Sequence, residues 1–294
     1  MAIVEEYINN RWCDNEEDKA GLLSSWQRFK ALGVADIGFE REFTKGNDPQ
    51  FFQRLWEMNL GLHLNNCGHK ISSVEHGPDF RFEVADKKVW VEAVCPTAAG
   101  LPADYLRASE KGEVRVDNMP HESILLRWTA GLVDKKRKYD RYITGNQPIV
   151  GEGDCAVIAI NGCQLGYRSD FEGITLLPCI VEATFPVGPI IVSSSHSTDE
   201  VVENVHSYRK RIVNLNGSSV PTDSFLNPDY AHISAAIGCV GHIDMACGEL
   251  SKIALVHNPN ASNPIPHGVM GADEEYWVEE HGDSFTLHKI KWGE

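Results

Sequence analysis

Three acidic residues of this chain have the types and the spacing to hold one cation together. Asp79 follows a Gly-Pro turn, Glu92 lies near the end of an apolar run, and Glu57 borders an apolar helical stripe. A lone carboxylate inside an apolar strand is unfavourable unless it is paired or bound to a metal. Oxygen donors alone suit Mg²⁺ or Mn²⁺ better than zinc. The sequence therefore predicts a site for Mg²⁺ or Mn²⁺ formed by Glu57, Asp79 and Glu92.

The predicted elements explain how these three residues could meet. Period-two alternation predicts strands over 79–85 and 88–95, joined by a tight turn. If this hairpin closes in register, Asp79 lies near Glu92. Glu57 comes from the helix that is predicted just before the sheet begins. The three carboxylates are therefore expected at one edge of the sheet.

A basic helix is predicted to cover this hairpin. The segment 120–143 reads as one long helix after a proline, with a three-four stripe at Ile124, Trp128, Leu132, Lys135, Tyr139 and Tyr142. Lys135 then faces the sheet and not the solvent. On the sheet side it would meet a carboxylate or a substrate phosphate. A different rotation of the helix would turn Lys138 inward in its place. Lys135 could also form only a local ion pair with Asp134 or Asp140.

The order of these features resembles the PD-(D/E)xK nuclease superfamily over roughly residues 50–162. The likeness lies in an acidic helix, the "GPD" turn at 77–79, the "VEA" strand at 91–93, a helix and an apolar strand. The superfamily's lysine would stand at position 94, which is Val94 here. Because that lysine lies on a neighbouring helix in some members of the superfamily, the resemblance assigns its role to Lys135.

The resemblance implies metal-dependent hydrolysis of phosphodiester bonds in nucleic acid, with DNA favoured over RNA. Asp79, Glu92 and Lys135 would be the catalytic residues. Lys138 would contact the substrate, and so would Tyr139 or, as an alternative, Tyr142. Mg²⁺ or Mn²⁺ would be the cofactor. A homodimer is compatible with this interpretation.

Two other functions stay open. One is a nuclease fold without catalysis that serves as a binding or assembly module, which Val94 and the net charge both favour. The other is a small-molecule hydrolase that uses the polar loops at 193–198 and 257–268. A separate group, His63, Cys67 and His69, straddles a predicted helix end, and its spacing does not favour a metal cluster.

Charge and cysteine content limit the class of protein. The 294 residues include 27 Lys and Arg and 42 Asp and Glu, a net charge of −15, which argues against a general DNA-coating protein. Local basic runs remain at 135–141 and 207–213. Eight cysteines without a CxxC pair predict reduced thiols and a cytoplasmic protein. No membrane span is expected, because Glu182 and three prolines interrupt the apolar region 174–192.

The predicted architecture is an α/β fold with a mixed β-sheet core flanked by helices. The resemblance makes this core restriction-endonuclease-like. We expect an N-terminal helical segment at 1–48, the core at 49–215, and a C-terminal β-rich extension at 216–294 that packs on the same core. Strands are also predicted at 69–75, 155–161, 189–194, 231–240, 252–257, 275–281 and 284–290.

Overall fold

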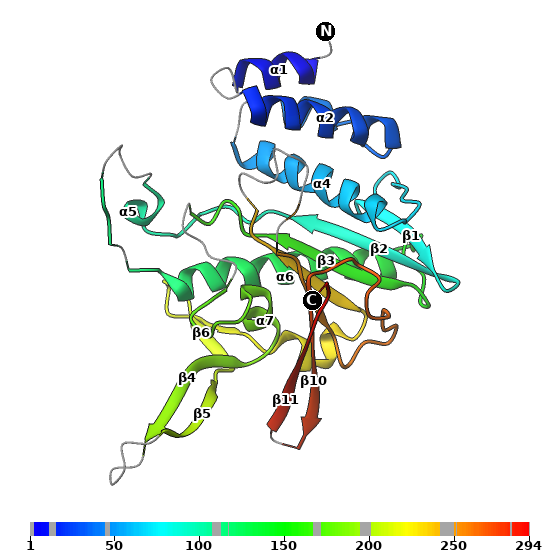
Figure 1. Cartoon of the computed structure of the whole chain (residues 1–294). Helices are drawn as coiled ribbons and strands as arrows, with labels where there is room; N and C mark the ends of the chain where they lie inside the picture. Colours follow the sequence, from blue (N-terminus) through cyan, green and yellow to red (C-terminus); the bar gives the residue numbers. More distant parts are fainter. Residues whose placement is uncertain are drawn as a thin grey trace.

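A computed structural model describes most of the chain. The described residues are 3–11, 16–44, 48–107, 113–116, 118–166, 172–194, 201–241, 250, 252–282 and 284–293. They form an α/β fold around a mixed seven-stranded sheet with helices on both faces (Figure 1). The predicted fold class is confirmed.

The central sheet joins the first half of the chain to the last. Its strand order is β1-β2-β3-β8-β9-β10-β11. The β2–β3, β3–β8 and β9–β10 pairs are parallel and the other three pairs are antiparallel. The strands span Phe80–Val84, Lys87–Val94, Cys155–Asn161, Ala235–Cys239, Ala254–His257, Glu274–His281 and Ser284–Lys291. The four C-terminal strands therefore extend the same sheet that holds the predicted carboxylates.

A two-residue turn closes the β1–β2 hairpin. Ala85 and Asp86 form it, and both have positive φ, at 47° and 65°. Such turns suit the right-handed twist of antiparallel strands. The resulting register pairs Phe80 with Val91, so its continuation by one residue places Asp79 opposite Glu92. The predicted hairpin is confirmed.

Each face of the sheet has its own helical layer. On one face, Val91 of β2 packs in a core with α1 (Ile3–Arg11), α2 (Glu16–Leu32), α3 (Phe39–Phe43) and α4 (Asp48–Asn66). On the other, Trp90 packs with α6 (His121–Thr144) and α7 (Cys179–Thr184). Alternation along β2 therefore directs odd-numbered side chains towards α4 and even-numbered ones, including Glu92, towards α6.

The remaining elements lie outside this sheet. β4 (Val187–Ser194) and β5 (Val201–Tyr208) form a hairpin that extends away from it, and β6 (Arg211–Val213) pairs only with β7 (Ser219–Pro221) (Figure 1). Three short helices complete the described part, α5 (Ala103–Leu106), η1 (Ser224–Leu226) and η2 (Pro228–Tyr230).

One predicted strand is wrong. The segment 69–75 makes only an isolated bridge, between Ser72 and Arg81, and is otherwise irregular. It follows the end of α4, where the chain turns back towards β1, and a single bridge holds it there.

No helix within the described residues is long and apolar enough to cross a membrane.

Candidate active site

A large cleft opens at the β1 edge of the sheet, between the two helical layers. Its volume is about 870 Å³. The α4 side, the turn before β1 and the α6 side all contribute to it. Its charged and aromatic lining includes Arg54, Glu57, Asp79, Lys135, Lys138, Arg141 and Tyr142. Four of the residues predicted from the sequence, two acids and two lysines, thus line one cavity. Glu92, the third predicted carboxylate, does not line it but accepts hydrogen bonds from both of these lysines.

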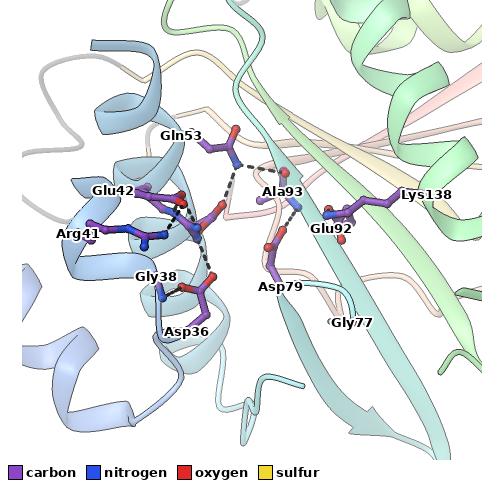
Figure 2. Close-up of polar contacts among 12 residues, drawn as sticks. Asp36, Gly38, Arg41, Glu42, Gln53, Gly77, Asp79, Glu92, Ala93 and Lys138 are labelled. Atoms are coloured by element: carbon purple, nitrogen blue, oxygen red, sulfur yellow. Dashed lines mark hydrogen bonds and ion pairs between the residues drawn. The ribbon is translucent and has the colours of Figure 1, made fainter. Parts of the chain in front are cut away.

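Asp79 stands at the entrance to β1, where the Gly77-Pro78 turn delivers the chain to the sheet. Its Oδ2 accepts a hydrogen bond of 2.7 Å from the Ala93 backbone N–H (Figure 2). Among the described residues Asp79 forms no ion pair. The strand beside it therefore fixes the carboxylate in place, but no neighbouring cation pairs with its charge.

Glu92 is fully buried on the α6 face of β2, and two lysines reach it from above. Its Oε1 accepts hydrogen bonds from Lys135 Nζ at 2.7 Å and Lys138 Nζ at 2.5 Å. Figure 2 shows Lys138 extending towards Glu92 from its helix. Tyr142 donates a longer bond of 3.5 Å to Oε2. Both lysines that the sequence offered as alternatives therefore meet the same carboxylate.

Position 94, where the resemblance would place a lysine, holds an apolar side chain beneath α6. Val94 points towards α6, with its Cγ1 3.5 Å from where a Cβ on Gly131 would stand. Lys135 lies one helical turn after Gly131 on the same face. The apolar side chain at 94 thus packs under the helix, and Lys135 enters the site from the helix side.

Glu57 reaches the cleft from α4 but is already paired. Its Oε2 lies 2.5 Å from Arg54 Nη1, and its Oε1 accepts from Gln53 Nε2 at 2.9 Å. Gln53 also bonds the Ala93 carbonyl at 3.3 Å and accepts from the Cys95 N–H at 2.8 Å. The glutamate is therefore held against β2, and it would act on a cation through water or after release from Arg54.

The carboxylates of the site differ in how far neighbouring positive charge compensates their own charge. Burial, followed by the charges of Glu92 and Glu57, raises the pKa of Asp79 well above its ordinary value. Burial also raises the pKa of Glu57, and Arg54 only partly opposes this. Burial alone would lower the pKa of Lys138, but Glu92 reverses the effect and the pKa is raised. Asp79 is thus the carboxylate whose charge is least compensated.

Tyr139 faces the sheet, as its stripe predicted, but it does not reach the cleft. It was predicted to contact substrate, yet its side chain is fully buried and does not line the cleft. Its hydroxyl donates to the carbonyls of Trp90, at 2.9 Å, and Val157, at 3.0 Å. Tyr139 therefore anchors α6 to two strands. Tyr142, one turn on, is the aromatic side chain that lines the cleft.

The histidines near the end of α4 have structural partners. His63 Nε2 lies 2.9 Å from the Met270 carbonyl, and His69 Nε2 lies 2.7 Å from that of Val269. Cys67 Sγ lies 3.7 Å from the His63 ring. Both rings therefore fasten the 269–270 backbone to the helix end.

Sequence reasoning missed the residues that support the acids. Gln53 and Arg54 precede Glu57 by four and three positions, a spacing at which helical side chains meet, and that signal was available. Arg141 lines the cleft one turn beyond Lys138 but gave no distinct pattern.

Comparison of the whole chain with protein-family models, with curated proteins and with solved structures finds no match.

Proposed function

We propose that this protein hydrolyses phosphodiester bonds of nucleic acid with Mg²⁺ or Mn²⁺. The observation that carries the proposal is the half-buried Asp79, which faces a large cleft without a cation partner and stands next to two buried carboxylates, Glu57 and Glu92. Lysines enter the same cleft from α6. Acidic donors beside fixed cations form the arrangement that metal-assisted phosphoryl chemistry requires.

The donor set fits a hard divalent cation. Carboxylate oxygens are its preferred ligands, and the raised pKa of Asp79 marks a site where added positive charge is favourable. Asp79 and Glu92 would hold the ion, with Glu57 contributing from α4. When bound, it would lower the pKa of a water molecule and offset charge on the phosphate oxygens.

The lysines have distinct parts in this proposal. The charge of Lys135 partly opposes the rise in the pKa of both Asp79 and Glu57, so it acts on the centre of the acidic group. Its side chain is 16% exposed, against 37% for Lys138. Lys135 would therefore orient the attacking water or stabilise charge on the phosphate. Lys138 and Arg141 would contact the neighbouring phosphates, with Tyr142 packing on a sugar or base.

A second candidate function has its own observation. Glu92 is paired with two lysines and Glu57 with Arg54, so most of the charge of the group is balanced within the protein. A module that binds nucleic acid or a protein partner without cutting would keep such pairs. Among these carboxylates, only Asp79, which has no ion pair within the described residues, favours an enzyme over a binding module.

The test is cleavage of labelled single-stranded and duplex DNA and RNA, with Mg²⁺ or Mn²⁺ and with a chelator. We expect metal-dependent cleavage by the native chain and none by Asp79→Asn. Lys135→Ala should lower kcat by about 10²–10³-fold, as expected for removal of one preorganised charge.

Lys136→Ala is the matched control. Lys136 lies next to Lys135 in sequence, but its Nζ bonds Asp140 at 2.9 Å and not the acidic group. Its cleavage rate should stay within a few-fold of the native rate. Binding of nucleic acid with no cleavage of any substrate, in either metal, would reject the enzyme and favour the binding module. Full activity in Lys135→Ala would transfer the role to Lys138.

A further inference from the structure

A second group of ligand-forming side chains lies in the other half of the sheet. His257 ends β9, Glu275 lies in β10, and His267 comes from the loop between these two strands. One donor atom from each residue lies within 4.8 Å of the other two. Since β3 and β8 separate β9 from β2 in the sheet, this group is independent of the cleft at Asp79.

All three side chains converge on one point. Glu275 is fully buried, and its Oε2 lies 3.0 Å from His257 Nε2 and 2.7 Å from His267 Nδ1. Donor atoms around a tetrahedral zinc ion are about 3.3 Å apart, given bonds of about 2.0–2.1 Å. If the donor atoms moved apart by a few tenths of an ångström, the ion would fit between them, with no change in the fold.

The surrounding structure holds these ligands in orientation. The Gly268 N–H donates to the second oxygen of Glu275, Oε1, at 2.7 Å, which leaves Oε2 directed at the imidazoles. Gly268 has φ of 77°, a conformation that favours glycine, so the chain is built to present that N–H. Trp277 packs edge-on against the His267 ring, with centroids 5.0 Å apart. Fixed outer partners of this kind are typical of metal ligands.

We infer that His257, His267 and Glu275 bind a borderline divalent metal of the zinc class. Two imidazoles and a carboxylate suit Zn²⁺ and do not suit Mg²⁺, which prefers oxygen donors alone. The His267 side chain is 43% exposed, so solvent reaches the site beside the buried Glu275. A fourth position is thus open to water or to another ligand. The ion ties the loop 258–273 to β9 and β10.

The experiment is a calorimetric titration of chelator-treated full-length protein with Zn²⁺ alone, repeated with Co²⁺ and its visible absorption. One Zn²⁺ per chain should bind and raise the melting temperature. His267→Ala, at a half-exposed position that tolerates truncation, should weaken binding by at least about 100-fold, since even outer partners of a metal contribute about 10–100-fold. His257→Gln should have the same effect.

Three controls make the outcome specific. His281→Ala changes an exposed histidine of the same strand β10 and should bind Zn²⁺ normally. Asp79→Asn should also bind it normally, which separates this site from the proposed nuclease centre. Absence of Zn²⁺ binding and of any thermal shift in the native chain would leave the three residues as a hydrogen-bonded network. Binding that survives His267→Ala but is lost in Cys67→Ala would overturn the assignment in favour of the Cys67–His63 pair.

Discussion

Glu92 and Glu275 are both fully buried carboxylates on strands of one sheet, but their partners differ in kind. Glu92 meets two lysines, whereas Glu275 meets two histidines. A buried charge needs compensation in either case. The comparison teaches that lysine partners fix the charge of a site, whereas imidazole partners can exchange a proton for a metal ion.

Asp79 completes the comparison, because it has neither kind of partner. It accepts one backbone hydrogen bond, and burial, followed by the charges of the neighbouring acids, raises its pKa, whereas the pKa of Glu275 is lowered. Burial opposes the charge of Glu275, but hydrogen bonds from His257, Gly268 and His267 overcome it. The two carboxylates therefore have pKa shifts of opposite sign: Asp79 has no cation paired with it, whereas hydrogen bonds stabilise the anion of Glu275.

The largest expected effect is on stability, from Glu92→Ala. This change would leave Lys135 and Lys138 facing each other without their shared acceptor, and removal of one partner of a buried ion pair costs about 3–5 kcal/mol. Urea unfolding should show a loss near the lower figure, because both lysines can turn towards the cleft. Glu83→Ala, at an exposed position of β1, should change the free energy of unfolding by less than about 0.5 kcal/mol. Equal values for the two variants would show that the lysines do not depend on Glu92.

A smaller loss is expected for Glu275→Ala. The change removes the shared acceptor of His257 and His267, so the cost is that of hydrogen-bonding groups left unpaired, about 1–3 kcal/mol. The measurement is again urea unfolding at neutral pH with chelator present. A loss larger than that of Glu92→Ala would contradict the distinction between lysine and histidine partners.

Opposite pH trends should follow from the two pKa shifts. For Asp79 the folded pKa is above 3.8, so its contribution to stability is greatest at low pH and is lost as the pH rises through the raised pKa. The stability of Asp79→Asn relative to the native chain should therefore increase as the pH rises from 4 towards neutrality. Mg²⁺ or Mn²⁺ should reduce this difference by stabilising the native chain.

For Glu275 the sign is reversed. Its folded pKa is below 4.5, so its contribution is present above that value and is lost as the pH falls through the lowered pKa. Glu275→Gln should therefore differ most from the native chain at neutral pH and least in acid. Unfolding free energies measured across this range test both variants, and parallel curves would show that the two carboxylates have the same environment.

Local patterns were sufficient for the parts of the site that lie close together in the chain. Two-residue alternation with a tight turn predicted the β1–β2 hairpin, and its register brings Asp79 to Glu92. The three-four stripe of α6 correctly placed Lys135 towards the sheet. Helix rotation was less certain, because Lys135 and Lys138 are three positions apart and can reach one point together. Tyr139 was misassigned for the same reason: the stripe gave its face but not its depth.

The sequence by itself determined the order of the elements, the apolar faces and the acids of the hairpin, since these depend on neighbours within a few residues. Only the tertiary structure decided the rest. Arg54 and Gln53 hold Glu57 against a strand some 40 positions away, a contact that requires α4 to dock. His257, His267 and Glu275 meet because β9 and β10 pair in parallel and return the loop between them to the sheet. Such contacts depend on packing between elements that are far apart in the chain, and this packing produces no periodic pattern in the sequence.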